Sequence, residues 1–160
     1  MPEPGSARVV SVNVSPGGVP KLPVPEQFVG RLGLADDRHI EPVPSHGGPD
    51  QAVCLYSMEA IQRLVDEGHN AFPGAFGENL TMEGIELDSI GPGDRLAIGR
   101  GGLVIEVTWH AAPCQKQAQW FADGRFARIS GKTHPADARW YARVVREGPV
   151  RPGDRIWVGG

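Results

Sequence analysis

Short segments of alternating apolar and polar residues recur along the chain and predict a strand-rich fold. In residues 8–14, RVVSVNV, apolar side chains return at every second position, which is typical of a half-buried strand. This alternation places on one face of the strand Val10, Val12 and Val14. Two later segments, GLVIEVTW at 102–109 and WYARVVRE at 140–147, indicate further strands in the same way.

One apolar run leads directly into a helix. Residues 51–57, QAVCLYS, are apolar enough for a buried strand, and the following MEAIQRLVDEG has the spacing of an amphipathic helix. Ser57 is a suitable N-cap and Gly68 a suitable C-terminal stop, so the helix is expected over 58–67. Its apolar face is expected to consist of Ile61, Leu64 and Val65.

A repeated turn favours a barrel. The segments GPGDRLAIG at 91–99 and RPGDRIWVG at 151–159 share a Pro-Gly-Asp-Arg turn followed by an alternating strand. Such repeated units favour a closed or nearly closed β-barrel over an open sheet, because a closed barrel leaves no unpaired edges. We therefore expect a single strand-rich α+β domain over 1–160, with a second short helix at 115–123. The Pro- and Gly-rich residues 15–50 are expected to form a long loop beside the mouth of a pocket.

Composition and charge exclude several classes of protein. A chain of 160 residues with 40% apolar and 22% charged residues fits one compact domain and argues against bulk disorder. The net charge of −3 gives no broad basic surface, so nucleic-acid binding is not expected. The apolar runs are too short to span a membrane, and MPEPGSARVV lacks the features of a secretory signal. With only two cysteines, we expect a cytoplasmic protein with free thiols.

The two cysteines occupy different sequence environments. Cys54 lies within the apolar strand 51–57, where a packed structural thiol is expected. Cys114 follows a proline in WHAAPCQKQ, at the junction between the strand 102–109 and the helix at 115–123. A helix N-terminus has free N–H groups and a partial positive charge, which favour the thiolate. Cys114 is therefore either a reactive or metal-ligating thiol or a plain buried cysteine.

Polar residues upstream of Cys114 are candidates for the same pocket. The Pro- and Gly-rich segment contains DDRH and SHGGPDQAV, in which His46 precedes two glycines that allow a ligand to approach the backbone closely. Glu78 and Asn79 stand directly before an expected strand. No Cys-x-x-Cys pair, His-Glu-x-x-His helix, calcium loop, Walker loop or dinucleotide fingerprint is present in the sequence. A single thiolate can still hold a metal whose other ligands belong to a cofactor.

The ordered motifs GLADDRH, HGGPDQAVCLYSMEAI, PGAFGENLTMEGI, IGPGDRLAIG and PCQKQ resemble the MOSC domain, a family named for the C-terminal region of molybdenum cofactor sulfurases. The resemblance spans residues 30–158. It implies a barrel fold with a bound molybdenum cofactor of the molybdopterin type. It also implies that the thiolate of Cys114 contacts molybdenum or carries sulfur. It also implies cofactor-binding roles for Arg38, His39, His46, Gly47, Gly48, Glu78 and Asn79.

Two positions depart from the family pattern. Many members have Gly-Asp where this chain has Asp36 and Asp37, and many have an arginine three residues before the cysteine, where this chain has Ala111. An arginine at that place is suited to hold an anionic group through its planar guanidinium. The sequence offers as replacements for this positive charge His110, Lys116, Arg125 and Arg128.

Three functions are compatible with these observations. The first, which the resemblance implies, is an oxidoreductase that reduces N-hydroxylated or N-oxygenated small molecules, such as modified nucleobases. The sequence has no flavin, haem or iron–sulfur motif, so this activity requires an external electron-donor protein. The second function is a noncatalytic carrier of cofactor or sulfur, in which Cys114 receives a persulfide from a separate desulfurase. The third is a Cys–His hydrolase with a nucleophilic thiolate.

Overall fold

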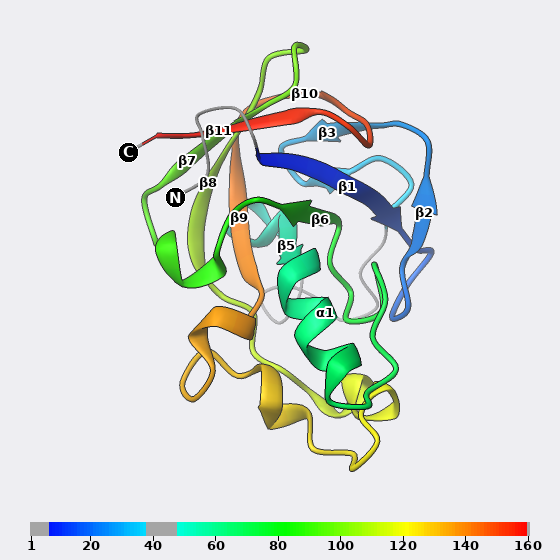
Figure 1. The fold of residues 1–160 in the computed structure, drawn as a ribbon. Coiled ribbons are helices and arrows are strands. Elements are labelled where there is room, and N and C mark those ends of the chain that lie inside the picture. Colours follow the sequence, from blue (N-terminus) through cyan, green and yellow to red (C-terminus); the bar gives the residue numbers. More distant parts are fainter. Residues whose placement is uncertain (1–6, 38–47, 160) are drawn as a thin grey trace.

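The computed structural model describes residues 7–37 and 48–159, and these residues form eleven strands, one α-helix and several short 3₁₀ helices (Figure 1). The strands are β1 (Ala7–Val14), β2 (Leu22–Val24), β3 (Gln27–Gly30), β4 (Gly33–Leu34), β5 (Val53–Ser57), β6 (Leu80–Glu83), β7 (Arg95–Ile98), β8 (Leu103–His110), β9 (Trp140–Arg146), β10 (Gly148–Val150) and β11 (Arg155–Gly159). The α-helix is α1 (Met58–Asp66). The 3₁₀ helices are Pro49–Gln51, Leu87–Ser89, Gln115–Trp120, Phe126–Ile129 and Pro135–Asp137.

The main sheet closes on itself as a barrel. Its strands follow the order β11-β7-β8-β9-β5-β6-β1-β2, and β11 also pairs with β1, so that seven strands form a ring and β2 extends from β1. Only β5 and β6 pair in parallel, and the other pairings of the described residues are antiparallel. The predicted strand-rich barrel with few helices is confirmed.

The strand β1 shows how an irregularity changes which side chains point inward. The register of β1 against β6 shifts between Val9 and Ser11, and the buried valines of this strand are Val9 and Val12. Val14 is partly buried and packs against the core, as predicted, whereas Val10 is partly buried without belonging to that packing, so the predicted face of Val10, Val12 and Val14 is wrong for Val10. A β-bulge inserts one residue, and a shift of one residue exchanges the two faces of a strand.

The helix α1 begins and ends where the sequence predicts. The Ser57 hydroxyl accepts a hydrogen bond from the Ala60 N–H at 3.1 Å, and Gly68 adopts a positive φ of 94° after the last turn. Ile61 and Leu64 are buried against the barrel, whereas Val65 is 43% exposed. The prediction that Val65 belongs to the apolar face is wrong, because Ala60 and Leu64 define the centre of that face and Val65 lies at its border.

The segment predicted as one long loop contains three short strands. Between residues 15 and 37, β2 extends the main sheet, while β3 and β4 form a second sheet of order β10-β3-β4. The prediction of a continuous loop is therefore wrong for this part. Strands of only two to four residues are too short to show the alternation on which the prediction depends, and β2 also contains a proline.

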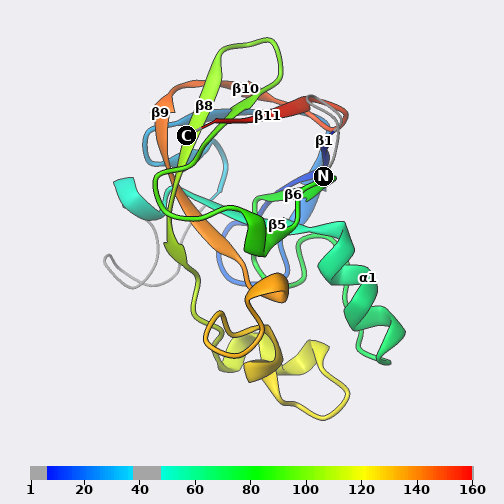
Figure 2. The ribbon, with the colours of Figure 1, turned by 60° about the vertical axis from the view of Figure 1, so that its left-hand side comes forward.

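The connection between β8 and β9 lies at one end of the barrel, next to the C-terminal end of α1, as both views show (Figure 2). Its backbone is fastened there, because the Asn70 N–H donates to the Trp120 carbonyl at 2.8 Å. The helix predicted at 115–123 is the 3₁₀ helix Gln115–Trp120. None of the helices in the described ranges is both long enough and apolar enough to cross a lipid bilayer.

Candidate functional site

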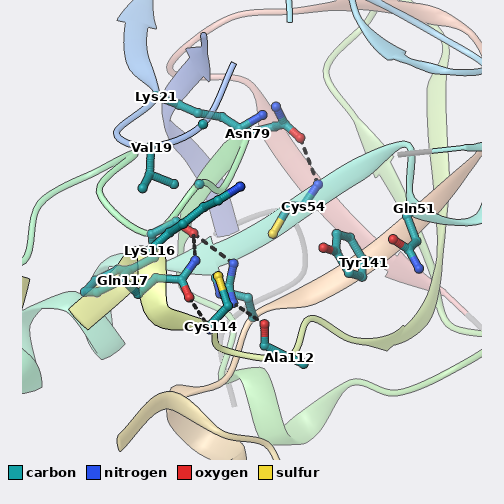
Figure 3. A pocket seen from close by; sticks show the side chains of 14 residues that line it. Val19, Lys21, Gln51, Cys54, Asn79, Ala112, Cys114, Lys116, Gln117 and Tyr141 are labelled. Carbon is teal, nitrogen blue, oxygen red and sulfur yellow. Dashed lines mark hydrogen bonds between the residues drawn. The ribbon is translucent and has the colours of Figure 1, made fainter. Parts of the chain in front are cut away.

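A pocket of about 70 Å³ lies where the start of this connection meets the barrel (Figure 3). The loop after β1 supplies one wall, β5 and β9 supply the floor, and the residues after β8 supply the opposite wall. Figure 3 shows the side chains that matter for its chemistry, which are Lys21, Cys54, Asn79, Cys114, Lys116 and Tyr141. Cys114 and Asn79, which the sequence proposed for one site, thus line the same pocket.

Cys114 is half-buried and held in place by Gln117. The backbone N–H of Cys114 donates to Oε1 of Gln117 at 2.6 Å, and the Gln117 N–H donates to the Cys114 carbonyl at 3.0 Å. The other end of the Gln117 amide donates from Nε2 to the Phe76 carbonyl at 3.2 Å. Because Gln117 is buried, these bonds fix the backbone from which the thiol projects.

Cys54 is a second thiol of the same pocket, which sequence reasoning missed. Its side chain is buried as predicted, but it lines the pocket together with Cys114 (Figure 3). Burial raises the pKa of Cys54 to about 11, against the opposing effect of the nearby positive charge of Arg139. Cys54 is therefore a neutral thiol at physiological pH.

Asn79 joins three parts of the pocket. Its Oδ1 accepts a hydrogen bond from the Cys54 N–H at 2.9 Å, and its Nδ2 donates to Oδ2 of Asp37 at 2.9 Å. Asp37 in turn forms a buried ion pair with Lys21, at 2.6 Å between Oδ2 and Nζ. Asn79 thus connects β5 to Asp37, which follows β4 and balances the charge of Lys21.

The remaining predicted cofactor-binding residues fall outside the pocket or outside the described ranges. Glu78 does not line the pocket; its Oε2 accepts hydrogen bonds from the Gly74 N–H and the Thr81 hydroxyl, both at 3.0 Å. Burial raises the pKa of Glu78. Gly48 precedes the 3₁₀ helix Pro49–Gln51 and does not line the pocket either. Four predicted cofactor-binding residues lie outside the described ranges, namely Arg38, His39, His46 and Gly47.

Positive charge reaches the pocket from a residue that the sequence did not single out. Arg139, only 4% exposed, lines the pocket and donates from its two terminal nitrogens to the carbonyls of Phe76, at 2.8 Å, and Ala112, at 3.1 Å. No local motif marks it, because it precedes an ordinary strand and reaches the pocket only through the pairing of β8 with β9.

Of the four replacements proposed for the arginine absent at position 111, only Lys116 lines the pocket. His110 stacks on Trp140, with 3.7 Å between the ring centroids, and burial lowers its pKa. Arg128 forms ion pairs with Glu67, at 2.6 Å, and Asp137, at 2.7 Å. Arg125 belongs to the connection between β8 and β9 but not to the pocket lining.

The side chains of the pocket suit a bound group that itself supplies most of the ligands of its metal. The described residues contain no group of three or more His, Cys, Asp and Glu side chains placed to hold a metal ion. The pocket instead combines one half-buried thiol with the basic side chains of Lys116 and Arg139. A soft sulfur donor beside positive charge is suited to a metal carried by an anionic group.

Comparisons with curated proteins identify bacterial relatives. The protein named "Uncharacterized protein YflK" from Bacillus subtilis (strain 168) is 34% identical over 116 residues, which are 70% of this chain and 49% of the relative. "Protein YiiM" from Escherichia coli (strain K12) is 29% identical over 140 residues, which are 84% of this chain and 60% of the relative. This chain thus spans about half to three-fifths of the length of these relatives.

Solved structures share the fold. The crystal structure of YiiM from Geobacillus stearothermophilus has a TM-score of 0.75 and 26% identity, over 96% of this chain and 75% of that chain. The YUAD protein from Bacillus subtilis, with a TM-score of 0.76 over 95% of this chain and 94% of that chain but 16% identity, agrees in fold alone. The family model of the MOSC domain matches residues 42–157, most of the chain. This protein therefore belongs to the MOSC domain family.

Proposed function

We propose that the pocket binds a molybdenum cofactor through Cys114 and that the protein reduces N-hydroxylated or related N-oxygenated small molecules. The observation that carries this proposal is the placement of Cys114, a half-buried thiol whose backbone is fixed by Gln117 at the wall of a basic pocket. Thiolate is a ligand suited to molybdenum, and a cofactor with its own dithiolene sulfurs needs only one such ligand from the protein.

The pocket residues fit the metal-bearing end of such a cofactor. Lys116 and Arg139 supply positive charge for an anionic group, and the pocket is large enough for a few small atoms. Binding sites for whole cofactors measure roughly 300–1,000 Å³, so the 70 Å³ pocket accounts for only part of the cofactor.

When bound, the cofactor supplies the two-electron chemistry that cleaves an N–O bond. Converting an N-hydroxyl group to the amine and water consumes two electrons and two protons, and we infer that an external donor protein delivers the electrons. Burial raises the pKa of Tyr141 to about 12, so its hydroxyl remains a hydrogen-bond donor to a ligand at neutral pH. Gln117 orients the Cys114 thiol, and Cys54 stays neutral beside it.

The residues of the pocket also bear on the two alternative functions, a sulfur carrier and a Cys–His hydrolase. A sulfur carrier would use Cys114 to hold a persulfide received from a desulfurase, and its half-buried position admits such a group. A Cys–His hydrolase requires a histidine within reach of the thiol. None of the histidines in the described ranges lines the pocket, so the proposed oxidoreductase is favoured over a hydrolase.

The test compares Cys114→Ser with Cys54→Ser in protein made by a host that synthesises the cofactor. We expect Cys114→Ser to lower the turnover of an N-hydroxylated purine by at least about 100-fold, with the melting temperature unchanged, because a hydroxyl is a harder and much less acidic ligand. Cys54→Ser should lower the melting temperature, because its thiol is packed, and it should lower the turnover far less than Cys114→Ser does.

Molybdenum content and pterin fluorescence of each purified variant complete the comparison. Undiminished turnover in folded Cys114→Ser protein would contradict the ligand role. A persulfide on Cys114 in protein without turnover would instead favour the carrier.

A further inference from the structure

Arg139 is a buried cation that lacks a partner of opposite charge. Its terminal nitrogens donate to two backbone carbonyls, and its Nε has no hydrogen-bond partner although it is shielded from water. Within the described part of the chain, no carboxylate forms an ion pair with this guanidinium. Burying an unpaired charge costs free energy, so a residue in this state indicates a group that is present when the protein works.

The described acidic residues nearest to the pocket, Asp37 and Glu78, form no ion pair with Arg139. Asp37 is committed to Lys21 and Asn79, at 2.6 and 2.9 Å. Glu78 acts on Arg139 only from a distance, and its own pKa is raised by burial, which favours the uncharged acid. The uncompensated positive charge of Arg139 therefore favours the binding of an anion in the pocket.

Position 139 lies directly across from position 111. In the β8–β9 pair His110 is opposite Trp140, and one residue further the Ala111 N–H donates to the Arg139 carbonyl at 3.0 Å. Position 111 carries a methyl group, and the side chain of Arg139 bonds the carbonyl of the adjacent Ala112 at 3.1 Å. The guanidinium of Arg139, which directly precedes β9, thus reaches the segment after β8 that carries Cys114.

We propose that Arg139 is the anion-binding residue of this pocket and holds an oxyanion beside the Cys114 thiol. The proposal rests on the proposed function, because it assigns to Arg139 the recognition of the charged end of the group bound at Cys114. A planar guanidinium binds two oxygens of one anion, which a point charge such as a lysine ammonium does not do. The 70 Å³ of the pocket suits a tetrahedral oxyanion, with either a metal-bound oxygen or a phosphate group as its source.

The experiment uses the full chain purified without cofactor and titrated calorimetrically with molybdate and, separately, with inorganic phosphate. We expect at least one probe to bind, and Arg139→Gln to weaken this binding at least tenfold. Arg125→Gln is the matched control, because Arg125 does not line the pocket. The affinity of this variant for the same probe should stay within twofold of the parent's affinity. A double variant, Ala111→Arg with Arg139→Gln, should regain most of the lost affinity, because it returns a guanidinium from the opposite strand.

A second measurement needs no variant and so does not depend on whether Arg139→Gln folds. The side-chain N–H resonance of Arg139 should shift on addition of the bound probe, and that of Arg125 should not. Failure of the parent to bind either probe would overturn the inference, and so would binding that leaves Arg139 unshifted or survives Arg139→Gln unchanged.

Cys114→Ser separates this inference from the proposed function and identifies the source of the anion. Molybdate binding that requires both Arg139 and Cys114 supports the inference with a metal-bound oxygen as the source. Phosphate binding that requires Arg139 but not Cys114 supports it with a phosphate group as the source. Oxyanion binding that depends on Arg139 in a protein with no reductase activity would reject the proposed function and retain the inference.

Discussion

The two thiols of the pocket differ in how much water reaches them. Cys114 is half-buried, whereas Cys54 is 5% exposed and its burial raises its pKa to about 11. Only a thiolate reacts readily with alkylating reagents, so the two side chains have separate chemistries although they share one cavity. One thiol is available for ligation, and the other forms part of the floor.

This difference predicts selective alkylation of Cys114. In native protein treated with iodoacetamide at pH 8, we expect mass spectrometry of the peptides to show modification of Cys114 at least tenfold faster than of Cys54. The rate at Cys54 should keep rising up to about pH 11, because the fraction of thiolate grows until the pH reaches its pKa. Denatured protein is the control, in which both cysteines should react alike. Equal rates in the native protein would contradict the assigned environments.

At the scale of single elements, α1 depends on a local cap and on a narrow apolar face. The Ser57 hydroxyl satisfies the Ala60 N–H, which would otherwise have no partner at the start of the helix. Ala60, Ile61 and Leu64 are buried, and Met58 at the start of the helix is partly buried against the core. The stability of α1 therefore resides in the cap and in this face.

Ser57→Ala should lower the free energy of unfolding by about 1 kcal/mol, since an N-cap serine contributes roughly 0.5–2 kcal/mol. Val65→Ala is the comparison, with an expected change below about 0.5 kcal/mol, because Val65 is 43% exposed. Urea denaturation of both variants measures the difference. A larger loss at Val65 than at Ser57 would show that the buried face of α1 has been misplaced.

The elements also show how far the sequence determines the site. Ser57, Gly68 and the apolar run before them are local signals, and they predicted the strand and the bounds of the helix. The inward face of β1 was not predictable, because its bulge arises from the pairing with β6. Arg139 and the pocket-facing side of Cys54 escaped detection for a related reason, since both depend on the neighbours of β9 in the barrel. Motif resemblance identified Cys114 and Asn79, which do line the pocket.

At the scale of the whole molecule, β11 closes the barrel. It pairs with β7 on one side and with the start of β1 on the other, so that Ile156 lies opposite both Ile98 and Ala7. Ile156 is 1% exposed and packs in the core where the first and last strands of the ring meet. Closure removes the free edges that would otherwise be open to pairing with other chains.

Ile156→Ala should lower the free energy of unfolding by about 2–5 kcal/mol, through lost apolar contact and the cavity left behind. Val158→Ala on the same strand is the matched control and should cost less than about 0.5 kcal/mol, because Val158 is 51% exposed. Guanidinium denaturation followed by fluorescence compares the two. If both variants lost the same amount, the junction of β1 and β11 would not be a main contributor to stability.

The pairing of Ala7 with Ile156 also has a consequence for protein synthesis. On the ribosome, β1 is translated before β2, β6 and β11, and it can pair first with β2 and then with β6. Ala7 and Arg8, on the edge of β1 that also pairs with β2, find their partner only when β11 has been translated. During that interval the nascent chain exposes unpaired backbone groups, which attract other nascent chains and are a substrate for chaperones. The barrel therefore closes only after all seven strands of its ring have been translated.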